Sequence, residues 1–232
     1  MPSPHMIEAR LGYTFQDPER LRVALTPPSA GLPHNNQRLE FLGDALLQAA
    51  MGLLIFQAKP DWKEGPMSKL RGLFVSVDSL RDWAEALGVE LVRGPRTTRT
   101  QGPSGQGKPL SDAMEALLAA VFEDAQAGGG DGFSAVLRLV EHRFGEAVRT
   151  AELGCWELRD PKTTLQERAS ARGLPAPVYA LLRQSGPDHQ PVFHVQVTVG
   201  PHASEGAGLS LKRAQAEAAL VLLKRLEPAP PA

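Results

Sequence analysis

The chain has 232 residues, of which 42% are hydrophobic and 22% are charged, and its formal net charge is −1. This composition is typical of a globular protein with one large or two modest domains. No apolar run approaches the roughly 20 residues that a membrane-spanning helix needs, and residues 1–6 lack the basic and apolar regions of a signal peptide. We therefore expect a cytoplasmic protein with no membrane partner. Cys155 is the single cysteine, which excludes an intramolecular disulfide and a cysteine-rich zinc site.

Helical patterning dominates the first 150 residues. Apolar residues recur at intervals of three and four, which predicts helices over residues 7–11, 18–25, 37–57, 67–74, 79–87, 111–125 and 133–150. Residues 94–109 are rich in Gly, Pro and Thr and predict a mobile surface loop. Basic residues in and beside this loop are candidate phosphate contacts, although a merely solvated loop is the simpler interpretation: Arg93, Arg96, Arg99 and Lys108. Residues 1–151 are thus predicted to form an all-α domain.

The pattern changes after residues 152–159, which show no clear periodicity and are predicted to be a linker. A helix is predicted over 163–171, strands over 178–183, 192–199 and 206–210, and a helix over 212–226. This order predicts a small α+β domain (α-β-β-β-α) over residues 160–227, with a disordered tail at 228–232. The chain has 17 basic and 20 acidic residues before Asp160 (net −3), and 8 basic and 6 acidic residues from Asp160 onward (net +2). The C-terminal part is therefore the more basic of the two, although the contrast is small.

Two pairs of acids have the spacing of one helical turn. Glu40 and Asp44 are four residues apart, and Asp112 and Glu115 are three residues apart, so each pair lies on one face of its predicted helix. Apolar neighbours place these acids at the border of a core, where four carboxylates require cations or protonation. If the two faces meet, they would hold Mg²⁺, for which Mn²⁺ can substitute. Taken alone, such a pair is far more often simply the solvated side of an amphipathic helix.

The sequence around both pairs resembles the ribonuclease III family. Residues 36–47, Asn-Gln-Arg-Leu-Glu-Phe-Leu-Gly-Asp-Ala-Leu-Leu, are similar to its signature helix, and residues 112–117, Asp-Ala-Met-Glu-Ala-Leu, are similar to its second acidic helix. The resemblance extends from about residue 7 to residue 227. It implies a homodimeric endonuclease that hydrolyses both strands of double-stranded RNA and leaves 5′-phosphate and 3′-hydroxyl ends. Divalent ions would activate water and stabilise charge on the phosphate oxygens.

The resemblance also assigns residues in the helical domain. The acids that match the family's metal ligands are Glu40, Asp44, Asp112 and Glu115, with Asp44 and Glu115 as the catalytic residues. Glu64 matches an acid that contacts RNA near the cut, and Gln37 stands where relatives usually have a glutamate with a related role. Pro27-Pro28 replaces a His-Arg pair that is common in the family.

The C-terminal order of elements resembles a double-stranded RNA-binding domain. The resemblance implies that Gln166 and Glu167 hydrogen-bond to 2′-hydroxyls and that His189 enters the next minor groove. Lys212 and Arg213 would meet phosphates at the start of the last helix. Leu211 stands where the family usually has lysine, which removes one phosphate partner. Each of these residues, taken singly, is also explained as an ordinary surface residue.

Two other functions remain open at this point. The first is a double-stranded RNA-binding scaffold or chaperone that does not cleave, for which four retained acids would be unnecessary. The second is an all-α phosphohydrolase that acts on nucleotides. That class relies on histidine together with aspartate, and no such pair stands out in the helical half of the sequence.

Overall fold

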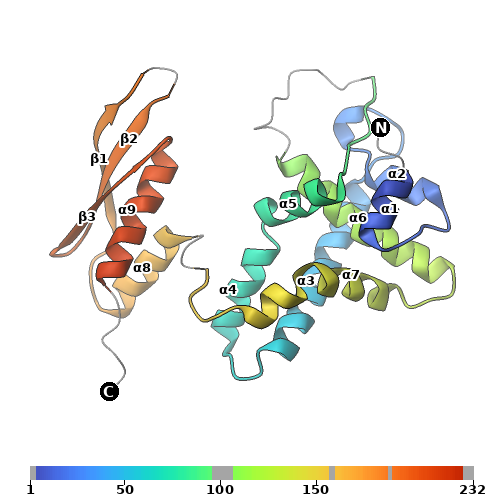
Figure 1. The fold of residues 1–232 in the computed structure, drawn as a ribbon, viewed down its shortest axis with the longest axis horizontal. Coiled ribbons are helices and arrows are strands. Elements are labelled where there is room, and N and C mark those ends of the chain that lie inside the picture. The colour runs from blue at the N-terminus through green and yellow to red at the C-terminus, as the bar shows by residue number, and fades with distance from the viewer. Residues whose placement is uncertain (1–3, 96–106, 157–159, 188–189, 227–232) are drawn as a thin grey trace. The chain divides into compact units, whose positions relative to one another are not determined.

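The chain divides into two compact units, Met1–Leu153 and Gly154–Ala232 (Figure 1). The computed structural model describes residues 4–95, 107–156, 160–187 and 190–226. The division lies within residues 152–159, where the sequence predicts a linker. The predicted tail at 228–232 is outside the described residues.

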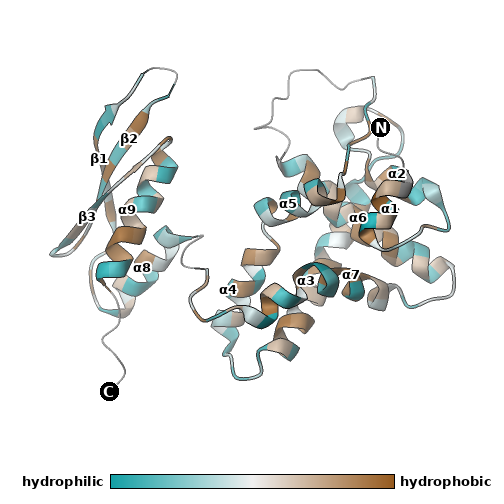
Figure 2. Ribbon diagram, viewed as in Figure 1, coloured by the Kyte–Doolittle hydropathy of each residue, from teal (hydrophilic) through white to brown (hydrophobic). Residues whose placement is uncertain are grey.

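The described part of the N-terminal unit is helical, which confirms the prediction of an all-α domain. Its helices are α1 (Pro4–Leu11), α2 (Pro18–Ala24), the short 3-10 helix η1 (Pro28–Ala30), α3 (Gln37–Ala58), α4 (Glu64–Phe74), α5 (Val77–Leu87), α6 (Gly107–Ala127) and α7 (Gly132–Thr150). Most of them show both hydrophobic and hydrophilic segments (Figure 2), as helices with one face in a core do. Pro28 is the first residue of η1, and Pro27 is the residue before it.

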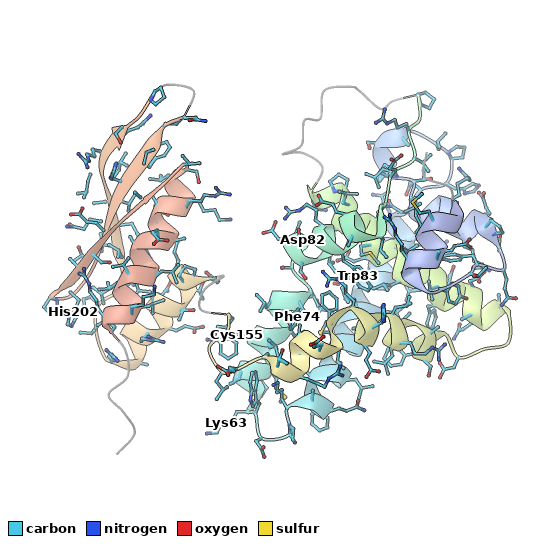
Figure 3. All side chains as sticks on the ribbon, in the orientation of Figure 1. Lys63, Phe74, Asp82, Trp83, Cys155 and His202 are labelled. Carbon is cyan, nitrogen blue, oxygen red and sulfur yellow. The ribbon has the colours of Figure 1, made fainter. Side chains whose placement is uncertain are left out.

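The core of this unit forms around α3 and α6. In α6, the side chains from Ala116 to Val121 are fully buried, so this helix lies in the centre of the unit. Gly43 of α3 packs directly against α6: a Cβ atom at this position would overlap the main-chain carbonyl of Glu115. Side chains from α4, α5 and α7 meet nearby in an aromatic cluster (Figure 3). The centre of the Phe144 ring lies 5.3 Å from the centre of the Phe74 ring and 5.2 Å from that of the Trp83 ring.

Helix α3 has the length and the apolar composition of a membrane-spanning helix, contrary to the expectation from the sequence. Its residues Leu47, Ala50 and Met51 are fully buried inside the unit. The central helix of a globular core meets the same two criteria, because it is apolar on several faces. The packing therefore identifies α3 as a core helix.

The end of α3 is attached to the end of α7. Lys59, the residue after α3, donates hydrogen bonds from Nζ to the carbonyl oxygens of Arg149 at 2.7 Å and Ala151 at 2.6 Å. Its ammonium group also lies 5.1 Å from the centre of the Trp62 ring. A lysine that satisfies the last carbonyls of a helix stabilises that end, because the helix dipole is negative there.

The C-terminal unit has the predicted α-β-β-β-α order, which is confirmed. It consists of α8 (Pro161–Ala171), β1 (Val178–Ser185), β2 (Val192–Val199), β3 (His202–Gly208) and α9 (Leu211–Arg225), and the three strands form an antiparallel sheet in the order β1-β2-β3. One face of the sheet and the two helices bury a common core that includes Leu165, Val197, Val199, Ala218 and Leu222.

The third strand begins at His202 rather than at residue 206, where the sequence predicts it. Val199 pairs with His202 across a tight turn, in which Gly200 has a φ of +56°. The strand is rich in small and polar residues, so its conformation comes from pairing with β2 rather than from its own β-propensity. Gly206 of β3 lies against α9, where a Cβ atom would overlap the main chain of Ala218.

Candidate active site

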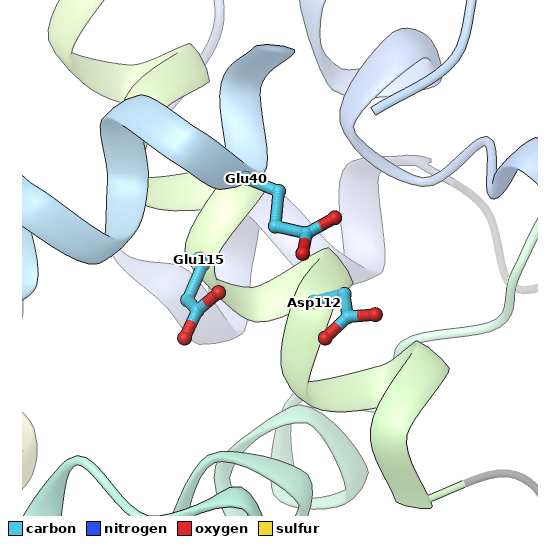
Figure 4. Close-up of side chains that lie close together, drawn as sticks. All are labelled: Glu40, Asp112 and Glu115. Carbon is cyan, nitrogen blue, oxygen red and sulfur yellow. The ribbon is translucent and has the colours of Figure 1, made fainter. Parts of the chain in front are cut away.

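Three of the four predicted metal ligands form one cluster. Glu40 of α3 and Asp112 and Glu115 of α6 each have a carboxylate oxygen within 4.8 Å of the other two, and all three residues are partly buried (Figure 4). Asp44 lies outside this group and is exposed to solvent. It is nevertheless close enough for its charge to raise the pKa of Glu115. The two acid-bearing helix faces therefore meet, as the hypothesis of a metal site requires.

Gly43 explains why these faces meet. It lies between Glu40 and Asp44 in the sequence, and its missing side chain lets α3 touch the main chain of Glu115. A glycine inside a helix costs roughly 1 kcal/mol relative to alanine. Its presence here is a packing requirement, since any larger residue would separate the two acid pairs.

The cluster concentrates negative charge. The pKa of Glu115 is raised to about 7, first by burial and then by the charges of Asp44, Asp112 and Glu40. The pKa of Glu40 is also raised, by burial and then by Asp112. A cation beside these groups would relieve both effects. The donor set consists of carboxylate oxygens, which suits hard divalent ions such as Mg²⁺ and Mn²⁺.

Lys108 lies beside the cluster and not in a loop. Helix α6 begins at Gly107, so the prediction that residues up to 109 form a loop is wrong. The Lys108 ammonium group is 3.1 Å from Oδ2 and 3.4 Å from Oδ1 of Asp112. Lys108 and Asp112 are four residues apart, and this spacing is the signal in the sequence that could have indicated the ion pair. Of the other loop candidates, Arg93 is exposed, and Arg96 and Arg99 are outside the described residues.

The two further positions predicted to contact RNA in this unit are exposed and do not belong to the three-acid cluster. Gln37 is the first residue of α3, and its backbone N–H donates to Oδ1 of Asn35 at 3.1 Å. Glu64 is the first residue of α4 and accepts a hydrogen bond from the Ser68 hydroxyl at 2.9 Å. Their roles therefore stay predictions.

In the C-terminal unit, Gln166 and Glu167 are exposed on α8, and Lys212 and Arg213 are exposed in the first turn of α9. His189 is outside the described residues. Several other basic residues donate hydrogen bonds within the unit. A count of charges in the sequence does not distinguish these residues from Lys212 and Arg213, which are exposed to solvent. Examples of basic side chains that donate hydrogen bonds within the unit are those of Lys162 to Gln215, Arg168 to Leu223, Arg172 to Leu226 and Arg225 to Ala203.

Together, the fold and the site define a class of protein: a helical unit with a carboxylate cluster suited to divalent cations, followed by a unit that has the fold of a double-stranded RNA-binding domain. Comparison with protein families gives the same result, since residues 37–126 match the ribonuclease III domain and residues 161–226 match the double-stranded RNA binding motif. The chain belongs to the ribonuclease III family and is a double-stranded RNA endonuclease of the metal-dependent type.

The similarity extends over nearly the whole chain. Proteins named ribonuclease 3 are 37% identical over 95% of this chain and 94% of their own length in Cereibacter sphaeroides, and 35% identical over 90% of this chain and 84% of their own length in Nitrosomonas europaea. Among solved structures, the nuclease domain of ribonuclease III from Campylobacter jejuni is 32% identical, with a TM-score of 0.52, and covers 62% of this chain and 97% of that domain.

Proposed function

We propose that this enzyme cleaves both strands of double-stranded RNA with Mg²⁺, or Mn²⁺ in its place, held by Glu40, Asp44, Asp112 and Glu115. The observation that carries this proposal is the convergence of Glu40, Asp112 and Glu115 from two helices within 4.8 Å. Bound divalent ions would supply a water of lowered pKa and stabilise charge on the departing 3′-oxygen. We place this activity in the cytoplasm, where transcripts form duplexes.

The residues of the site have distinct roles in this proposal. Glu115 must lose its proton to act as a ligand, and its pKa of about 7 makes this step sensitive to pH near neutrality. Asp44 is the exposed acid of the set, so it faces the solvent from which the RNA arrives. Gly43 fixes the separation of the two helices. The products are 5′-phosphate and 3′-hydroxyl ends.

RNA recognition is assigned mainly to the C-terminal unit. Lys212 and Arg213 lie at the positive end of α9, where exposed amides and the helix dipole favour phosphate. Gln166 and Glu167 are proposed to contact 2′-hydroxyls, and His189 to contact the neighbouring minor groove. In the helical unit, the exposed residues Gln37 and Glu64 are proposed to contact RNA near the cut.

We also propose a homodimer that buries an apolar stripe on α3. Phe41 is 83% exposed and Phe56 is 68% exposed, and between them Ala45 and Ala49 are exposed as well. These positions follow one face of the helix, opposite the face that packs in the core. A second copy is the proposed occupant, because a self-complementary stripe forms a closed twofold contact. One structure of the Campylobacter jejuni nuclease domain is described as flexible in a region involved in dimer formation.

The activity is tested by incubating the full-length protein with long duplex RNA, single-stranded RNA and duplex DNA, each with Mg²⁺ or Ca²⁺. We expect cutting of duplex RNA with Mg²⁺ and binding without cutting with Ca²⁺, which is larger and accepts looser geometry. Binding to duplex RNA without cutting under every metal condition would instead favour the non-cleaving scaffold.

Glu115→Gln tests the ligand assignment. This variant should bind duplex RNA with the affinity of the wild type and cut it at least roughly a hundredfold more slowly, since one ligand and one negative charge are removed. The matched control is Glu123→Gln, because Glu123 is on the same helix but pairs with Arg20 at 3.1 Å. Cleavage by Glu115→Gln at the rate of this control would contradict the assignment.

The dimer is tested with Phe41→Glu, which should sediment as a monomer at micromolar concentration because a charge replaces an exposed ring on the stripe. Leu153→Glu is the control, since Leu153 is 66% exposed but lies outside α3. A Phe41→Glu protein that sediments with the mass of the wild-type dimer would exclude this stripe as the interface.

A further inference from the structure

Lys108 is the cation that faces the acidic cluster in the described part of the chain. Its side chain is 73% exposed, whereas that of Asp112 is 23% exposed. The ammonium group lies within hydrogen-bonding distance of both carboxylate oxygens of Asp112. It also interacts electrostatically with Glu40 and Glu115. A single flexible side chain at the edge of the site therefore partly neutralises three of the four acids.

The ammonium group and a divalent ion would compete for the same oxygens. A carboxylate of Asp112 that binds a metal ion has less negative charge to share with Lys108, and the two cations repel each other at short range. The flexible aliphatic stem of Lys108 carries its charge from the first turn of α6 into solvent, so the ammonium group is free to leave Asp112. The pairing can therefore exchange without moving the backbone.

We propose that Lys108 is a tethered counter-ion of the metal-free site, which yields Asp112 to the divalent ion and then binds a phosphate oxygen of the RNA at the site of cleavage. Lys108 thus has two successive partners, a role that rests on the proposed metal site. Before metal binding, Lys108 limits the repulsion among the acids. Afterwards its ammonium group remains next to the cluster, where a compact positive charge suits a phosphate oxygen.

Lys108→Gln keeps a long polar side chain but removes the charge. If the exchange occurs, this variant should have a higher metal affinity and a lower cleavage rate than the wild type. Without RNA, the full-length variant should bind Mn²⁺ roughly three- to tenfold more tightly than the wild type, because a competing charge is gone. At saturating Mg²⁺, its single-turnover cleavage of duplex RNA should be roughly tenfold slower, because the phosphate no longer has a charged partner at this position. A lysine that only stabilises the helix surface would change neither quantity.

The metal affinity is measured by calorimetric titration of Mn²⁺ into the metal-free protein, and the rate by rapid quench. Lys108→Arg should retain the wild-type values within about twofold, since it keeps the charge. Arg138→Gln is the control for net charge, because Arg138 is exposed on α7, which carries none of the four acids.

Each result decides a separate point. Wild-type Mn²⁺ affinity in Lys108→Gln would overturn the exchange, and a wild-type single-turnover rate would overturn the phosphate contact. An equal increase of affinity in Arg138→Gln would show an effect of net charge alone and would also overturn the proposal. If the wild-type protein itself bound no Mn²⁺, the proposed metal site would fail, which distinguishes that failure from the failure of the role of Lys108.

Discussion

Glu115 determines how the active site responds to pH. Its carboxyl group has an ordinary pKa of 4.5 and is raised to about 7 by burial and by the neighbouring acids. Between these two values the folded protein holds a proton that the unfolded chain has released. Raising the pH through this range therefore reduces the free energy of unfolding of the metal-free protein. Bound divalent ions would remove this loss, because they neutralise the ionised carboxylate.

We predict that the melting temperature of the metal-free protein falls between pH 5 and pH 8 and that added Mg²⁺ raises it more at pH 8 than at pH 5. Thermal unfolding followed by circular dichroism, with EDTA or with Mg²⁺, measures both quantities. In Glu115→Gln the metal-free protein should lose much of this pH dependence, whereas Glu123→Gln should keep it. Equal slopes for the two variants would show that another group is responsible.

The sequence predicts the acids of the site but not what surrounds them. Helical spacing is enough to place Glu40 with Asp44 and Asp112 with Glu115, because it depends on local geometry alone. The raised pKa of Glu115 depends on burial and on residues from both helices, which periodicity does not contain. Lys108 is not predicted as a partner of Asp112, because the composition of the chain before residue 111 favours a loop.

At the scale of elements, the close contact between α3 and α6 depends on the absence of a Cβ atom at Gly43. We predict that Gly43→Ala destabilises the helical unit by on the order of 3 kcal/mol, because the added methyl group would overlap the main-chain carbonyl of Glu115 and push the helices apart. Metal affinity should fall with it, since the two acid pairs separate. Chemical unfolding and calorimetric titration measure the two effects.

The same substitution elsewhere provides the control. Gly72 of α4 has no atom within 4 Å of an added Cβ, so Gly72→Ala should leave metal binding unchanged and stabilise the protein by up to about 1 kcal/mol through helix propensity. A Gly43→Ala protein as stable as Gly72→Ala would mean that close packing at Gly43 does not hold the site together.

Several helices begin earlier than the sequence predicts, and in α4, α6 and α8 the difference involves a proline near the start. The structure starts α4 at Glu64, α6 at Gly107 and α8 at Pro161, whereas the sequence pattern predicts starts at 67, 111 and 163. Each helix has a proline within its first three residues: Pro66, Pro109 and Pro161. Proline is tolerated there because the first backbone N–H groups of a helix have no partner inside it. Interpreting these prolines as breaks makes the predicted helices too short.

At the scale of the whole molecule, each unit has its own hydrophobic core. We therefore predict that a chain ending at Arg159 folds, dimerises and loses most of its affinity for duplex RNA at physiological salt. Sedimentation and filter binding measure these properties. A fragment with the RNA affinity of the full chain would remove the reason for assigning RNA binding to the C-terminal unit.

A smaller change in the full chain gives a graded version of this test. Removing both charges in the first turn of α9, with Lys212→Gln and Arg213→Gln, should reduce the slope of log affinity against log salt by about one for each phosphate that the protein no longer neutralises. Lys224→Gln, at the other end of α9, is the control and should leave the slope unchanged.

The order of the two units can be predicted because it follows from local sequence patterns, which are helical before residue 150 and mixed after it. The start of β3 cannot, because pairing with β2 determines it. The exposed stripe of α3 also escapes prediction: an apolar residue such as Phe41 fits the core pattern of the sequence, and only the packing shows that it faces solvent.

Lys59 has a mechanical consequence for the chain that continues from α7 toward the C-terminal unit. The carbonyl groups of Arg149 and Ala151 stand at the point where the chain leaves α7, and both are hydrogen-bonded to a side chain at the end of α3. A force on the chain beyond Ala151 would therefore be shared between α7 and α3. Because α3 carries Glu40 and Asp44, part of that force would act on the helix that holds two of the four acids.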